Sequence, residues 1–152
     1  MAYATGGAVA LIDPLVVDGW EALDELVAGR GVSVLTTLDW HRRSSVEAIE
    51  RYEATTAPPA GVQDVRFPDA GETMFWLPGP RALVPGDRIL GAGGGLRLCP
   101  ESWLGYLPSG IGLGDLREQL LPLLELPIEL VLVSHGEPVL EGGHAALARA
   151  LG

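Results

Sequence analysis

The side chains best suited to chemistry lie in one short segment, 39–43, with the sequence Asp-Trp-His-Arg-Arg. A carboxylate, an imidazole and two guanidinium groups can bind metals, transfer protons and hold anions. The apolar run at 33–35 predicts a buried strand before this segment, and 44–47 (Ser-Ser-Val-Glu) has the form of a capping box that begins a helix. Turns between a strand and a helix commonly carry function in α/β proteins, so we expect a site here.

The elements that would position this turn are predicted from apolar spacing. An apolar run at 8–12 predicts a strand that ends at Asp13-Pro14. Helical spacing over 20–27, with Asp18 as a candidate cap, predicts a first helix, and 45–52 predicts a second. This alternation of strands and helices predicts an α/β (α+β) fold in which helices pack against a sheet.

The rest of the chain is predicted to be strands followed by helices. Pro78-Gly79-Pro80 predicts a hairpin turn, and the glycines of 91–95 predict a strand connection, because no Lys-Ser/Thr follows as a phosphate loop requires. We expect 98–114 to form a loop or lid, and Pro122 to kink or divide the helix that Asp115 opens. The other predicted elements are strands at 62–65, 73–77, 81–84, 88–90 and 129–133 and a last helix at 143–151.

Composition excludes several classes of protein. The 152 residues carry 10 basic and 20 acidic side chains, a net charge of −10 that argues against a nucleic-acid-binding surface. Cys99 is the single cysteine, so no intrachain disulfide can form, which favours a reducing compartment. Residues 1–10 lack the positive and the long apolar regions of a signal peptide, so we expect none, and no apolar run approaches the length of a membrane span. We therefore expect one cytoplasmic domain over 1–152.

The polar segments recur in an order that resembles the metallo-β-lactamase-fold hydrolases. In that family a Leu-Ile-Asp segment is followed by Thr-His-x-His-x-Asp-His, Gly-His-Thr, Gly-Asp and Gly-His-Gly. The resemblance implies a four-layer αββα sandwich with a shortened N-terminus, and a site where one or two metal ions activate water. The matching segments here are Leu11-Ile12-Asp13, 36–42, Gly71-Glu72-Thr73, Gly86-Asp87 and Ser134-His135-Gly136.

The family's ligand positions are mostly changed in this chain. Asp87 and His135 keep the family residue, whereas Thr37 and Asp39 stand at the places of histidines. The resemblance implies a hydrolase-type site for a small molecule with one divalent cation (zinc, iron or manganese) or none, with His41 and Asp87 as catalytic residues. The candidate metal ligands are Asp39, His41, Glu72, Asp87 and His135, whereas Arg42 stands at the place of a third histidine.

Two further hypotheses concern charge and assembly. Adjacent arginines at a helix N-terminus are unfavourable unless an anion lies there, either a protein carboxylate or a bound anionic small molecule. In the first case Arg42 would pair with Asp39, Asp87 or Glu72, and would replace the metal if its partner were Asp87 or Glu72. In the second case Trp40, Arg42, Arg43 and Ser44 would bind the ligand. The alternative function is then a non-catalytic descendant of the fold that either binds an anionic small molecule or acts as a dimerising structural protein. An unpaired strand edge at 8–12 would favour a homodimer.

Overall fold

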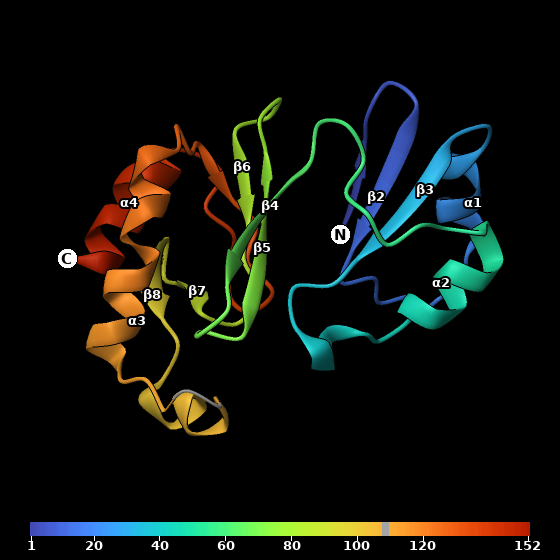
Figure 1. Cartoon of the computed structure of the whole chain (residues 1–152). Helices are drawn as coiled ribbons and strands as arrows, with labels where there is room; N and C mark the ends of the chain where they lie inside the picture. Colours follow the sequence, from blue (N-terminus) through green and yellow to red (C-terminus); the bar gives the residue numbers. More distant parts are fainter. Residues whose placement is uncertain (108–109) are drawn as a thin grey trace. The chain divides into compact units, whose positions relative to one another are not determined.

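A computed structural model describes residues 1–107 and 110–152. The chain, drawn in Figure 1, divides into two compact units, Met1–Gln63 and Asp64–Gly152. Each unit has its own apolar core. Among the described residues, every helix is too short or too polar to cross a lipid bilayer.

The first unit is a small sheet with two helices. Its strands β1 (Ala2–Ala4), β2 (Ala8–Ile12) and β3 (Gly31–Leu35) lie in the order β1-β2-β3, with β1 antiparallel and β3 parallel to β2. The helices are α1 (Glu21–Val27) and α2 (Ser45–Tyr52), and the 3-10 turn η1 (Asp39–His41) precedes α2.

One face of this sheet packs against the helices. Val9 pairs with Val32 and Leu11 with Val34, and these alternate residues share a core with Ala48 of α2. The period of two along the strands and the apolar stripe of each helix explain why these residues form a common core.

Two sequence predictions fail in this unit. The expected free edge at 8–12 is wrong, because β2 pairs with β1 on one side and with β3 on the other. The homodimer stays a prediction without that support. The capping box is also wrong: α2 begins as expected, but the Ser44 hydroxyl accepts the N–H of Val16 at 3.1 Å, and Glu47 accepts the indole N–H of Trp20 at 3.0 Å.

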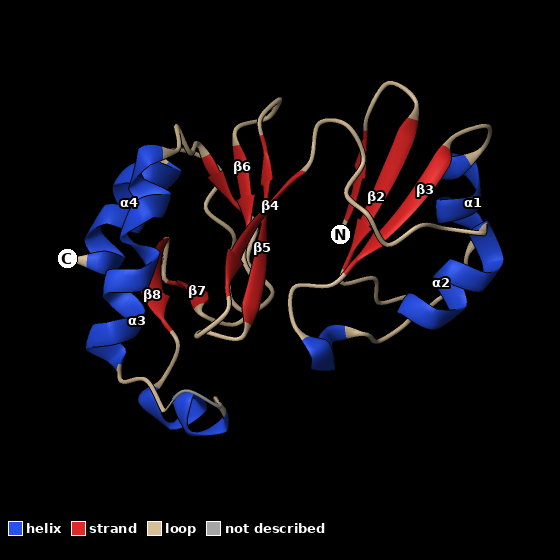
Figure 2. Ribbon diagram, viewed as in Figure 1, coloured by secondary structure: helices blue, strands red, loops and turns tan. Residues whose placement is uncertain are grey.

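The second unit contains two sheets and the remaining helices (Figure 2). The larger sheet has the order β4-β5-β6-β9, formed by β4 (Gln63–Phe67), β5 (Glu72–Leu77), β6 (Ala82–Val84) and β9 (Leu130–Val131). The smaller sheet is the hairpin of β7 (Ile89–Ala92) and β8 (Gly95–Leu98). The helical elements are η2 (Glu101–Tyr106), α3 (Leu113–Leu120), η3 (Leu121–Glu125) and α4 (Gly143–Leu151).

Packing in this unit confirms several local predictions. Met74 of β5 shares one core with Leu120 of α3 and Leu147 of α4. Pro122 divides the predicted helix, since α3 ends before it and η3 contains it. The glycine run forms the β7–β8 turn, where Gly93 and Gly94 have positive φ. The predicted lid includes residues 108–109, which lie outside the described residues.

Candidate metal-binding site

In the first unit a buried hydrogen-bonded group joins the ends of β2 and β3. Asp13 follows β2, and its carboxylate oxygens accept the backbone N–H of Thr37 at 2.8 Å and the Thr37 hydroxyl at 2.6 Å. The same carboxylate lies 2.9 Å from Nδ1 of His41. All three side chains are buried, and the parallel pairing of β2 with β3 brings Asp13 and Thr37 to one edge of the sheet.

This arrangement determines which nitrogen of His41 carries a proton. An ionised carboxylate can only accept hydrogen bonds, so Nδ1 of His41 is the donor to Asp13. In the neutral imidazole Nε2 then has the lone pair that a metal or a proton requires. A carboxylate that accepts the second N–H is the usual outer partner of a metal-binding histidine, so His41 suits that role.

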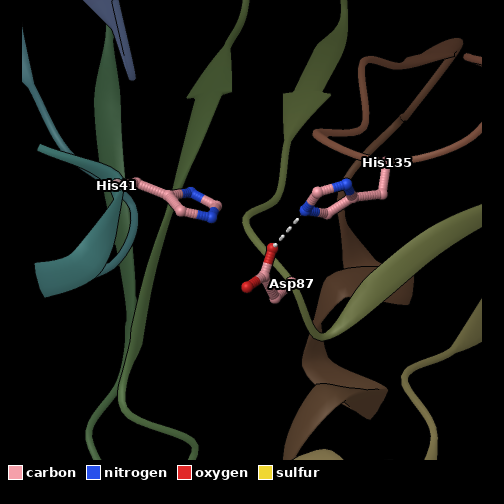
Figure 3. Close-up of side chains that lie close together, drawn as sticks. All are labelled: His41, Asp87 and His135. Atoms are coloured by element: carbon pink, nitrogen blue, oxygen red, sulfur yellow. Dashed lines mark ion pairs between the residues drawn. The ribbon is translucent and has the colours of Figure 1, made fainter. Parts of the chain in front are cut away.

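In the second unit the carboxylate of Asp87 lies beside the imidazole of His135. Oδ1 of Asp87 lies 3.4 Å from Nε2 of His135, and Figure 3 shows the carboxylate and the imidazole facing each other. The Asp87 side chain is 10% exposed and that of His135 is 50% exposed, and the ring of Trp103 lies edge-on to His135. A carboxylate oxygen and an imidazole nitrogen form a donor pair that suits zinc, iron or manganese.

Glu72 is buried beside Asp87 but faces the backbone. Its Oε1 accepts the N–H of Gly86 at 2.8 Å, and its Oε2 accepts those of Asp87 and Arg88, each at 3.0 Å. Burial raises the pKa of Glu72 to about 7, while these N–H donors and the Arg88 guanidinium oppose the rise. The predicted metal ligand therefore has another role, since both of its oxygens already accept backbone N–H groups.

The loop that carries His135 is held by two glycines. The N–H of Gly91 in β7 donates to the carbonyl of His135 at 2.9 Å. A Cβ added at Gly91 would overlap the backbone of Glu137, and one added at Gly136 would overlap the backbone of Gly91. The close approach of these two backbones leaves no room for a side chain and places His135 beside Asp87.

Replacing Gly91 by alanine should therefore lower the free energy of unfolding by about 1–3 kcal/mol, because a backbone segment would have to shift. Urea denaturation measures the loss. Gly95→Ala is the matched control, since its new Cβ would be at an ordinary 3.7 Å from the carbonyl of Ala92. Equal stability of the two variants would contradict the close approach.

Asp39 and Arg42 of the polar turn are both exposed. The Asp39 side chain is 95% exposed and the Arg42 side chain 70% exposed, and they pair with each other at 3.6 Å. Within the first unit Arg42 therefore pairs with Asp39, and its pairing with Asp87 or Glu72 of the second unit stays a prediction. Asp39 is solvated on the surface and is not built into a buried ligand set.

The other residues that were predicted to bind an anionic ligand have different surroundings. Trp40 is 56% exposed with its ring edge-on to His41, and Arg43 is exposed with a positive φ of 36°. The Ser44 hydroxyl oxygen accepts the N–H of Val16. Asp39 is the anion beside Arg42, as the structural alternative predicted, and binding of a free anion stays a prediction.

Sequence reasoning did not identify Asp13 as a site residue or Glu72 as a partner of the backbone. The Leu-Ile-Asp segment was the available signal for Asp13, since an acidic residue directly after a buried strand is costly unless it has partners. For Glu72 no such signal existed, because its three donors lie 14–16 residues further along the chain.

Comparison with known proteins identifies the fold. No protein-family model matches the chain, and no curated protein matches its sequence. Among solved structures, the DIM-1 metallo-β-lactamase is similar, with 16% identity, a TM-score of 0.62, and coverage of 99% of this chain and 83% of that one. VMB-1 matches with 16% identity, a TM-score of 0.55, and coverage of 99% and 84%. The metallo-β-lactamase from Pontibacter korlensis matches with 14% identity, a TM-score of 0.53, and coverage of 99% and 83%.

Proposed function

From the metallo-β-lactamase fold of the chain we propose that it is a metal-dependent hydrolase of a small, anionic molecule with one divalent cation, whose candidate ligands are His41 in the first unit and Asp87 and His135 in the second. The fold itself is shared by the solved structures above, which confirms the predicted fold class. The catalytic role, the metal and the substrate class are the proposal, and they depend on the geometry within each unit.

The observation that carries the proposal is the buried hydrogen bond between Asp13 and His41. Burying a carboxylate and an imidazole is costly, and the hydrogen bond at 2.9 Å with the Thr37 hydroxyl alongside compensates that cost. The same contact orients the ring and leaves Nε2 of His41 available as a ligand.

The second unit supplies the other two proposed ligands in a similarly ordered form. Asp87 lies on a loop whose backbone is bound by Glu72, and the His135 loop is held by Gly91. A small number of imidazole and carboxylate ligands leaves positions open for water and substrate, as catalytic sites require.

A single cation is proposed because the other family ligand positions have different roles here. The Thr37 hydroxyl donates to Asp13, Asp39 is on the surface with Arg42, and Glu72 binds backbone N–H groups. These side chains already have other partners, so the described residues offer no second full set of ligands.

The chain's own residues would prepare the site in defined ways. A bound divalent cation would lower the pKa of a water molecule towards neutrality and supply a nucleophile. Asp13 would keep the proton on Nδ1 of His41 throughout. The exposed guanidinium groups of Arg42 and Arg43 would attract a negatively charged substrate.

Metal content tests the proposal directly. Protein that is loaded with zinc and then dialysed to remove free zinc should retain about one zinc ion per chain. Inductively coupled plasma mass spectrometry measures this zinc content. His135→Ala should lower zinc affinity by more than the roughly 10–100-fold that loss of an outer partner causes. Isothermal titration calorimetry measures the zinc affinity of the wild type and of the variant.

His144→Ala is the matched control for that substitution. His144 lies in α4, where its Nε2 is 2.9 Å from the carbonyl oxygen of Leu124, and its loss should leave zinc affinity unchanged. The proposed metal site would be contradicted if the wild type did not bind zinc, or if His135→Ala and His144→Ala lost zinc affinity equally. The non-catalytic alternative, a binder of an anionic small molecule, would then take its place.

A further inference from the structure

We infer that Glu72 is a positioning residue for Asp87, because its buried carboxylate holds the backbone on which the Asp87 side chain is presented. The inference rests on the proposed metal site, and it assigns a role within that site to a residue that does not bind the metal. It is drawn from the contacts of the second unit alone.

The carboxylate of Glu72 binds three consecutive N–H groups of one turn. Gly86, Asp87 and Arg88 donate to it at 2.8, 3.0 and 3.0 Å, so the residue that carries the proposed ligand is the middle one of the three. Consecutive N–H groups that converge in this way form a concave nest that holds an acceptor. Glu72 is therefore the internal acceptor of this nest.

The turn is also fixed where it leaves the nest. The Arg88 side chain is buried, and its Nε donates to the carbonyl of Ala70 at 2.8 Å. The carbonyl of Arg88 accepts the N–H of Cys99 at 3.1 Å. With the backbone held by Glu72 and by these contacts, the direction of the Asp87 side chain towards His135 is set before any ligand binds.

A carboxylate is needed at position 72 because only acceptor atoms suit three donors. A glutamine of the same shape would direct an NH₂ group at one or more of the N–H groups, and donors that face each other cannot form a hydrogen bond. Buried N–H groups without acceptors are unfavourable, so the turn would rearrange and move Asp87.

Two measurements on Glu72→Gln test this role. Amide hydrogen exchange of Gly86, Asp87 and Arg88 should be slow in the wild type and at least about tenfold faster in the variant. Cobalt(II) should bind the variant about 10–100-fold more weakly, with a changed visible absorption spectrum, as expected when an outer partner of a ligand is lost. The spectrum reports the ligand geometry without any assay of activity.

Leu120→Ala is the control for general destabilisation. Leu120 is fully buried in α3, and its truncation should lower stability while cobalt(II) affinity and the spectrum stay unchanged. Equal cobalt(II) affinity in wild type and Glu72→Gln would overturn the inference, and so would equal losses in the two variants.

The failure of the inference can be distinguished from failure of the metal site. A wild type that binds no cobalt(II) overturns the proposed function, and the positioning role with it. A wild type that binds cobalt(II) but exchanges its Gly86–Arg88 amides as fast as those of the Gly93-Gly94 turn overturns the inference alone. That comparison needs no variant, so it decides the matter even if Glu72→Gln does not fold.

Discussion

Asp13→Asn is expected to weaken zinc binding by about 10–100-fold. The free energy of unfolding should change less than the free energy of zinc binding. The asparagine keeps the shape of the side chain and tolerates the positive φ of 45° at this position. Its amide NH₂ group, however, would replace an oxygen that accepts hydrogen bonds from Thr37 and His41. The hydrogen-bond pattern of the buried group must then invert.

The physical reason is the tautomer of His41. With an NH₂ group opposite Nδ1, the ring is most stable with Nδ1 as acceptor and the proton on Nε2. That proton occupies the lone-pair position that the metal requires. Nitrogen-15 chemical shifts of the ring distinguish the two tautomers, and calorimetry measures the affinity for zinc.

Asp39→Asn is the matched control, because it makes the same chemical change at a side chain that is 95% exposed. Zinc affinity should not change in this variant. A loss of affinity at Asp39 with none at Asp13 would reverse the assignment of the two residues and return Asp39 to the ligand set.

The second large effect concerns stability against pH. The pKa of Glu72 is about 7 in the folded protein, raised by burial from its ordinary 4.5. The folded state therefore binds this proton more tightly than the unfolded state, and stability falls as pH rises between these values. The contribution of Glu72 is fully present below pH 4.5 and is lost as pH rises through about 7.

The size of the effect follows from the shift. A rise in pKa from 4.5 to about 7 corresponds to about 3 kcal/mol. We expect the difference in unfolding free energy between wild type and Glu72→Gln to change by that amount over this pH range, because glutamine does not titrate. Guanidinium denaturation from pH 4 to 8 measures both curves, and parallel curves would show that Glu72 has an ordinary pKa.

Local structure could be predicted from the sequence wherever neighbouring residues decide it. The apolar stripe of 143–151 matches α4, the strand–turn–helix order of 33–52 is present, and Pro122 divides its helix. Helix caps were less predictable, since α1 begins after Trp20 and Ser44 accepts a distant N–H. A short polar side chain forms whichever hydrogen bond the nearby backbone offers, and a motif does not specify that backbone.

The sequence by itself determined the order of the polar segments and the fold class, and it supplied five candidate ligands, Asp39, His41, Glu72, Asp87 and His135. Only the tertiary structure decided which carboxylates belong to the buried groups: Asp13 binds His41 across 28 positions, and Glu72 binds the 86–88 backbone. The physical reason is that a buried carboxylate is stable only beside donors, and the course of the strands decides which donors it meets. Asp39 meets water and Arg42 instead, although it lies two residues from His41.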